Sequence, residues 1–129
     1  MGAERSQIGR MLAAVLAAVA VLMLAVQGAT TQGAEERPLV LVTPVEGAIG
    51  PPATRHISSV IEEGEERGAA LVVLRMDTPG GLTTSTRDIN KAILAAQVPV
   101  AVHVAPAGAR AASAGTYILF ASHVAAMAE

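Results

Sequence analysis

Apolar residues along this chain follow two alternating patterns: short continuous runs, and longer stretches in which they recur every three or four positions. The first pattern is typical of buried strands and the second of amphipathic helices. We predict helices at 53–67, from Ser85 onward and at 112–122. We predict strands at 39–42, 69–76 and 99–104, with a fourth beginning at 124–127.

The order of these elements predicts an α/β fold. Continuously apolar strands indicate parallel strands covered on both faces, and repeated strand–helix–strand units imply right-handed crossovers in a largely parallel sheet. Ser85 and Asp88 are three positions apart, which predicts a capping box at the start of the second helix. Ligands bind such sheets beyond the carboxyl ends of the strands. The loops at those ends are 43–52, 77–83 and 105–112.

The first thirty residues follow a different pattern and stand outside this fold. Arg5 and Arg10 precede an uncharged apolar run at 11–26, and small and polar residues follow it. This pattern predicts a secretory signal peptide at 1–29, and an uncleaved membrane anchor is the alternative. Residues 30–38 are polar and predict a linker. Positive charge before the apolar run places the rest of the chain on the extracytoplasmic side of the membrane.

Composition excludes several classes of function. Tyr117 and Phe120 are the sole aromatic residues and the formal net charge is −2, so the chain lacks the stacking and basic surfaces that bind nucleic acid. The absence of cysteine removes disulfides, thiolate metal sites and cysteine nucleophiles. The three histidines lack the spacing of a zinc helix, and we interpret the glutamates between 62 and 66 as a solvated helix face. We expect neither a metal nor a cofactor.

Ser113 is the first candidate for chemistry. It lies where the loop at 105–112 turns into the third predicted helix, and its neighbours Ala112 and Ala114 are too small to cover its hydroxyl. A helix N-terminus offers free N–H groups and a positive dipole end, which favour a developing oxyanion. Serine is also a favoured N-cap for structural reasons alone. The residue types leave both interpretations open.

The loop at 77–81, Asp-Thr-Pro-Gly-Gly, is the second candidate. Two glycines after a strand can present backbone N–H groups into a cleft, and such donors stabilise the tetrahedral intermediate of acyl transfer. An ordinary tight turn explains the same residues. A phosphate loop is excluded because Asn90 precedes Lys91 and Ala92 follows it, and Ala111 stands where a hydrolase elbow needs glycine.

A serine nucleophile needs a base, and these residues offer poor ones. Lys91, the sole lysine, is predicted on the solvent side of its helix, where it keeps its proton. His123 follows Ser113 by ten residues, which is about 15 Å along a helix and too far for direct proton transfer.

Four segments, taken in order, carry a resemblance to a known family. They are 77–81, then 98–100 (Val-Pro-Val), then 106–118 (Pro-Ala-Gly-Ala-Arg-Ala-Ala-Ser-Ala-Gly-Thr-Tyr-Ile), then 121–128 (Ala-Ser-His-Val-Ala-Ala-Met-Ala). Together they closely resemble the NfeD (nodulation efficiency protein D) family of membrane-bound serine proteases, which have a ClpP/crotonase-like fold. The likeness covers roughly residues 38–128.

The resemblance implies that Ser113 is the nucleophile of a Ser-Lys dyad. It implies that the amides of Gly80, Gly81 and Ala114 form the oxyanion hole. The implied substrates are hydrophobic segments of membrane-associated proteins, stomatin-like proteins among them, and we expect the full-length form to be a homo-oligomer. We place the substrate cleft against three further residues: Pro79, Gly108 and Gly115.

The sequence departs from the family pattern at its end. The family's catalytic lysine lies some tens of residues beyond the nucleophile, whereas this sequence ends at Glu129. We therefore expect the N-terminal part, residues 39–129, of such a protease domain, inactive alone because the base is missing. Two alternatives stay open: a crotonase-type enzyme acting on acyl-CoA, and a non-catalytic module that binds apolar peptides between Gly80 and Ser113.

Overall fold

Four strands form one parallel sheet, in the same order in space as in the sequence. In the register of the sheet, Val42 lies opposite Val73 and Val73 lies opposite Ala101. The predicted α/β fold with a parallel sheet is therefore confirmed. The strands are β1 (Val40–Glu46), β2 (Leu71–Asp77), β3 (Val100–Val104) and β4 (Val124–Met127).

The computed structural model describes residues 15–16, 19 and 37–129. Most of the predicted signal peptide or anchor and most of the predicted linker lie outside these residues. Within the part that is described, no helix combines the length and the apolar character needed to cross a membrane.

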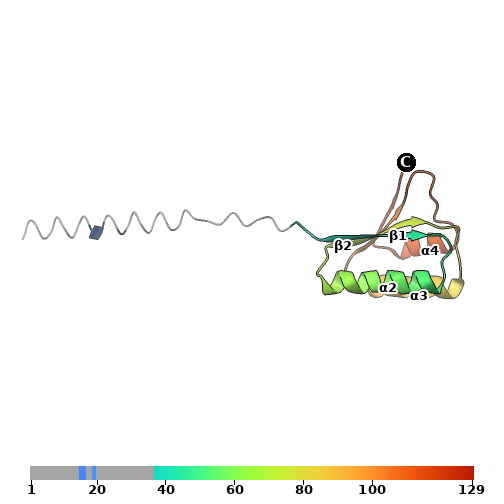
Figure 1. Cartoon of the computed structure of the whole chain (residues 1–129), viewed down its shortest axis with the longest axis horizontal. Helices are drawn as coiled ribbons and strands as arrows, with labels where there is room; N and C mark the ends of the chain where they lie inside the picture. Colours follow the sequence, from blue (N-terminus) through green and yellow to red (C-terminus); the bar gives the residue numbers. More distant parts are fainter. Residues whose placement is uncertain (1–14, 17–18, 20–36) are drawn as a thin grey trace, which may run out of the picture. The chain divides into compact units, whose positions relative to one another are not determined.

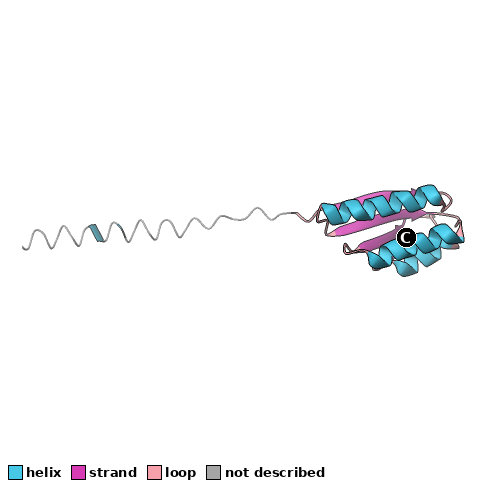
Figure 2. Ribbon diagram, turned by 90° about the horizontal axis from the view of Figure 1, so that it is seen from below, coloured by secondary structure: helices cyan, strands magenta, loops and turns pink. Residues whose placement is uncertain are grey.

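Three helices connect successive strands and pack against one face of the sheet (Figures 1 and 2). They are α2 (Pro51–Glu66), α3 (Thr83–Ala95) and α4 (Ala114–Ala121). The core lies between this helical layer and the sheet, where every second residue of β2 is buried. Apolar burial here is the main force that holds the helices on the sheet. Fully buried side chains come from all three helices and two strands: Ile57, Leu74, Ile89, Val102 and Ile118.

The prediction that the sheet is covered on both faces is wrong for the face opposite the helices. Val42 is 64% exposed and Val73 is half-buried, because no helix within the described residues packs on that side. Continuous apolarity correctly indicated parallel strands, but it does not show that both faces are covered. Arg75 and Glu46 form an ion pair across this face, with 3.7 Å between Nη2 and Oε1.

The loop predicted at 43–52 is largely strand and helix. β1 continues through Pro44 to Glu46, and this is possible because β1 is an edge strand that pairs with β2 alone. Helix α2 then begins at Pro51, with proline in its first turn, where the missing N–H leaves no helical bond unmade. These prolines therefore occupy positions at which a strand and a helix tolerate proline, and they do not indicate a loop.

The capping box predicted at Ser85 is absent. Helix α3 begins at Thr83 after Leu82, and no side chain caps it. Ser85 is buried inside the first turns, where its carbonyl accepts a hydrogen bond from the Thr54 hydroxyl of α2 at 3.4 Å. Ser85 therefore contacts α2 and does not cap α3.

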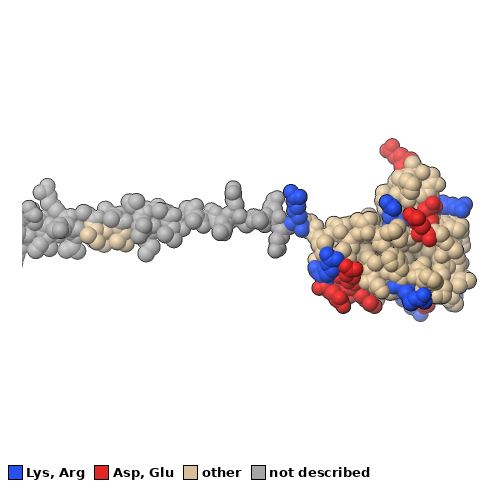
Figure 3. Space-filling view, viewed as in Figure 1, with Lys and Arg blue, Asp and Glu red and all other residues tan. Residues whose placement is uncertain are grey.

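The charged end of α2 matches the predicted solvated face. Acidic side chains gather there beside a basic one, and Arg67 bonds Glu63 at 2.5 Å (Figure 3). Both side chains are half exposed, so this pair contributes little to stability.

Candidate active site

Thr78 ties three loops together at the carboxyl edge of the sheet. It is fully buried, and its hydroxyl donates to the carbonyl of Gly47 at 2.6 Å. Its N–H donates to the carbonyl of Arg110 at 2.7 Å, and its carbonyl accepts from the N–H of Ala112 at 3.1 Å. These bonds fix the 77–81 loop against the segment that leads to Ser113.

Two glycines after Thr78 allow the chain to pass where side chains would collide. A Cβ on Gly80 would lie 2.7 Å from the Cβ of Ser113, and Gly80 has a φ of +114°. A Cβ on Gly81 would lie 2.0 Å from the carbonyl oxygen of Ile49. Ile49 holds the loop from the other side, because its N–H donates to Gly80 at 2.9 Å and its carbonyl accepts from Leu82 at 2.8 Å. Glycine is therefore required at both positions, because Ser113 and Ile49 lie too close to leave room for a side chain.

Ser113 has an unusual backbone conformation for a residue with a side chain. Its φ of 49° and ψ of −109° make it the sole non-glycine residue with a positive φ in the part of the chain described. Such a conformation costs on the order of 1–3 kcal/mol and is concentrated at functional sites. Ser113 occupies the N-cap position of α4, but its side chain makes no capping hydrogen bond. The structure thus weakens the purely structural interpretation of this serine.

The three amides predicted for an oxyanion hole differ in their availability. The N–H of Gly80 already donates to the Thr78 hydroxyl at 3.0 Å. The N–H groups of Gly81 and Ala114 make no hydrogen bond to any other described residue. Two amides close to Ser113 are therefore free to bind a ligand oxygen.

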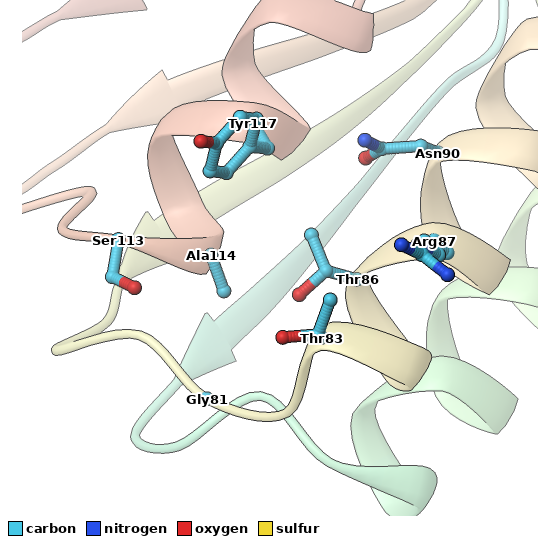
Figure 4. Close-up of a pocket in the computed structure, with 8 residues that line it drawn as sticks. All are labelled: Gly81, Thr83, Thr86, Arg87, Asn90, Ser113, Ala114 and Tyr117. Carbon is cyan, nitrogen blue, oxygen red and sulfur yellow. The ribbon is translucent and has the colours of Figure 1, made fainter.

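A cavity of about 370 Å³ opens beside these groups (Figure 4). The Ser113 hydroxyl points into it, toward the side bounded by Gly81 and Ala114. Its volume falls in the range of small-molecule and side-chain pockets. The cavity is lined by the β2–α3 loop, α3 and the start of α4: Gly81, Thr83, Thr86, Arg87, Asn90, Ser113, Ala114 and Tyr117.

The residues predicted for the substrate cleft lie elsewhere. Pro79, Gly108 and Gly115 are not among the residues that line the cavity. Gly115 is buried, and a Cβ there would lie 2.6 Å from the Cγ2 of Thr78. Gly108 is exposed in the loop before Ser113, with open space around it. Gly115 thus lets α4 pack closely against Thr78 and Met76, at the end of β2.

None of the cavity-lining side chains can serve as a base for Ser113. Arg87 is the one charged side chain among them, and no carboxylate, histidine or lysine joins it. Lys91 is exposed on α3 and lies outside the lining. His123 lies beyond the end of α4, and its Nδ1 accepts a hydrogen bond from the N–H of Val100 at 3.1 Å. A proton acceptor for Ser113 would have to come from another segment or chain.

Sequence reasoning missed the polar side of α3. The cavity residues of α3 are three or four positions apart, so they lie on one face of the helix. Their polar character at this spacing was the sequence signal that could have identified them. The strained backbone of Ser113 had no such signal, because the sequence shows only an ordinary N-cap residue. The missed residues are Thr83, Thr86, Arg87, Asn90 and Tyr117.

A parallel sheet whose strands are joined by helices packed on one face is consistent with a ClpP-like fold. A ClpP1 mutant from Listeria monocytogenes shares the fold, with a TM-score of 0.57 over 63% of this chain and 46% of that chain at 20% identity. The model of the NfeD1b N-terminal domain matches residues 39–129, and the chain belongs to that family. The predicted resemblance is confirmed.

Two curated relatives are similar over most of the folded unit. Membrane-bound protease PH1510 of Pyrococcus horikoshii is 37% identical over 90 residues, which cover 70% of this chain and 20% of that protein. Membrane protein NfeD1b of Bacillus subtilis is 30% identical over 109 residues, which cover 84% of this chain and 24% of that protein. The chain thus spans a quarter or less of the length of these relatives.

Solved structures of related proteins superpose on most of this chain. The 1510-N membrane protease specific for a stomatin homolog, from Pyrococcus horikoshii, superposes with a TM-score of 0.67 at 35% identity, over 70% of this chain and 46% of that one. A mutant of the 1510-N membrane-bound stomatin-specific protease in complex with a substrate peptide gives a TM-score of 0.69 at 35% identity, over 71% and 42%. These relatives are membrane-bound proteases of the same fold.

Proposed function

We propose that this chain carries the nucleophile of a membrane-associated serine endopeptidase. The observation that carries the proposal is the state of Ser113: exposed, strained, not used as a cap, and directed into a cavity beside two free amides. A plain N-cap serine would show none of these features together. The similarity of this chain to a membrane-bound protease supports the same assignment of Ser113.

In the proposed reaction, the Ser113 Oγ attacks the carbonyl carbon of the scissile peptide bond. The carbonyl oxygen becomes an oxyanion that accepts hydrogen bonds from the N–H groups of Gly81 and Ala114. The positive end of the α4 dipole adds to this stabilisation. The proton of the hydroxyl passes to a lysine of a Ser-Lys dyad, supplied from outside residues 37–129, and then to the leaving amine as the C–N bond breaks. Water then hydrolyses the ester formed on Ser113, which releases the acid product and restores the hydroxyl.

Exposed apolar side chains near the cavity favour a hydrophobic substrate. Leu82, which follows the cavity-lining Gly81, is 55% exposed, Tyr117 is 65% exposed, and Phe120, one turn further along α4, is 82% exposed. Clustered exposed apolar residues mark surfaces that bind peptides or membranes. We propose hydrophobic segments of membrane-associated proteins as substrates, stomatin-like proteins among them, in keeping with the stomatin-specific relative.

The cellular setting of this proposal follows from the N-terminal sequence. We propose that the apolar run at 11–26 exports the folded unit to the extracytoplasmic side or anchors it in the membrane, and that the working form is a homo-oligomer. The residues 37–129 alone would lack peptidase activity, because the lining of the cavity contains no base.

Labelling with a fluorophosphonate, which reacts with activated serines, tests the proposal. The longest natural form of the protein should take up the label at Ser113, and Ser113→Ala should abolish labelling. Ser59→Ala, at an exposed serine of α2, is the matched control and should label fully. Absence of label on Ser113 in that form would refute the peptidase proposal, and would leave a peptide-binding module or an acyl-CoA enzyme as the alternatives.

A further inference from the structure

The peptide group between Gly80 and Gly81 is held in one orientation by Ile49. The carbonyl of Gly80 accepts a hydrogen bond from the N–H of Ile49 at 2.9 Å. The C=O and N–H groups of a trans peptide point in opposite directions, and the sole cis peptide bond in the described part of the chain is the one before Pro106. The Gly81 N–H therefore points away from the nitrogen of Ile49, and Gly81 borders the cavity (Figure 4). Ile49 thus orients an amide that the proposed reaction uses for the oxyanion.

The turn that carries Ile49 is itself held by Thr78. Residues 47–50 connect β1 to α2, and the first of them, Gly47, bonds the end of β2 and the residue after it. Its N–H donates to the carbonyl of Asp77 at 3.0 Å, and its carbonyl accepts from the Thr78 hydroxyl at 2.6 Å. Thr78 is fully buried, and a hydrogen bond shielded from water is stronger than an exposed one. The Thr78 hydroxyl is therefore the side-chain group that fixes this turn against the 77–81 loop.

The same hydroxyl also acts on Gly80 directly. A threonine hydroxyl has a single proton, and this proton goes to the Gly47 carbonyl at 2.6 Å in preference to the Gly80 carbonyl at 3.3 Å. The hydroxyl oxygen then accepts from the N–H of Gly80 at 3.0 Å. The peptide groups on both sides of Gly80 are thus held, the first by Thr78 and the second by Ile49. The Gly81 N–H is the donor that this loop leaves for a ligand.

We infer that Thr78 is a positioning residue of the proposed peptidase and holds the Gly81 N–H in the direction that the oxyanion needs. Thr78 has no exposed surface and does not line the cavity, so it acts through Gly47 and Gly80 and does not touch the substrate. Donors fixed in advance stabilise a transition state because they need no reorientation during the reaction. Glycine has wide backbone freedom, so the pair would lose this orientation without the hydroxyl. The inference rests on the proposed function.

The kinetics of fluorophosphonate labelling, in the longest natural form of the protein, measure this effect. In that reaction the Ser113 Oγ forms a bond to phosphorus, fluoride leaves, and the phosphoryl oxygen occupies the oxyanion hole. The dependence of the labelling rate on probe concentration separates the dissociation constant of the probe from the first-order rate of bond formation. Thr78→Val should lower the first-order rate about 10- to 100-fold and change the dissociation constant by less than about twofold.

Two further variants distinguish positioning from a general loss of structure. Thr78→Ser keeps the hydroxyl and should recover most of the first-order rate. Thr43→Val is the matched control, because it removes the hydroxyl of another buried threonine, which bonds His56 at 2.6 Å and lies outside the cavity. It should leave the first-order rate unchanged. A merely structural role of Thr78 would lower the fraction of protein finally labelled but not the first-order rate of the folded fraction. That result, or an equal loss of rate in Thr43→Val, would overturn the inference.

Nuclear magnetic resonance of the 129-residue chain tests the geometry without the need for catalysis. The amide proton of Gly80 should shift upfield in Thr78→Val, as it does when a hydrogen bond is lost, and should return in Thr78→Ser. The amide proton of Gly80 should keep its position in Thr43→Val. An unchanged Gly80 resonance in Thr78→Val would overturn the inference whatever the labelling shows.

These experiments separate the inference from the function on which it rests. An unlabelled Ser113 in the unmodified protein would refute the peptidase and, with it, the catalytic effect assigned to Thr78. Labelled Ser113 with the same first-order rate in the unmodified protein and in Thr78→Val would uphold the peptidase and refute the positioning role alone.

Discussion

Gly68 and Gly81, which lie at opposite ends of the sheet, are glycine for different reasons. At the amino end, Gly68 closes α2 before β2 with a φ of +62°, and no atom within 4 Å would meet a Cβ there. At the carboxyl end, Gly80 and Gly81 lie against Ser113 and Ile49 at distances that exclude any side chain. Gly68 needs its backbone conformation alone, whereas Gly81 needs space alone and Gly80 needs both. The carboxyl end is the one at which this fold places its ligands.

The largest effect that this comparison predicts belongs to Gly81→Ala. The new Cβ would lie 2.0 Å from the carbonyl oxygen of Ile49 and 2.6 Å from its nitrogen, so backbone on the neighbouring loop would have to move. We expect a loss of at least about 3 kcal/mol in the free energy of unfolding, measured by urea denaturation.

Gly68→Ala is the matched control for that substitution at the other end of the sheet. It introduces left-handed strain without a collision, so we expect a cost of about 1 kcal/mol. Equal losses at Gly81 and Gly68 would show that the collision at Gly81 costs no more than left-handed strain does at Gly68.

Thr78→Val is expected to have the next largest effect. It keeps the shape of the side chain but removes the donor to the Gly47 carbonyl and the acceptor of the Gly80 N–H. Leaving such buried groups unpaired costs about 1–3 kcal/mol, which urea denaturation would measure. Thr78→Ser keeps the hydroxyl and loses only the methyl group, so it should cost less. A greater loss in the serine variant would assign the effect to packing of the methyl group against α4.

The sequence predicted the layout of the fold better than its details, and the reason is physical. Burial of alternating or continuous apolar runs is encoded locally, so the parallel order and the fourth strand, at 124–127, could be predicted. Ser85, which the sequence predicts to cap α3, instead contacts α2 through a bond from Thr54, some thirty residues away in the sequence. Local spacing of Ser85 and Asp88 could not anticipate that contact.

The candidate site divides in the same way. Ser113 and the glycine pair could be named as candidates because they lie in loops at the carboxyl ends of strands, and because the family resemblance pointed to them. The engagement of the Gly80 N–H by Thr78, and the unpaired Oδ1 of Asn90, arise from tertiary contacts. Whether a buried polar atom finds a hydrogen-bond partner depends on the folded chain, so it can be seen only in the structure.

Ser113→Gly is expected to have the smallest effect on stability, and its sign is the informative quantity. Glycine adopts a φ of 49° without strain, and the serine side chain makes no capping bond that would be lost. We therefore expect Ser113→Gly to raise the free energy of unfolding by about 1 kcal/mol relative to Ser113→Ala, which keeps the strain. That gain would mirror the loss expected for Gly68→Ala, since both substitutions exchange a side chain at a left-handed position. Urea denaturation of both Ser113 variants gives the comparison directly. A glycine variant less stable than the alanine variant would show that the backbone at Ser113 is relaxed, and strain would then give no support to the role proposed for this serine.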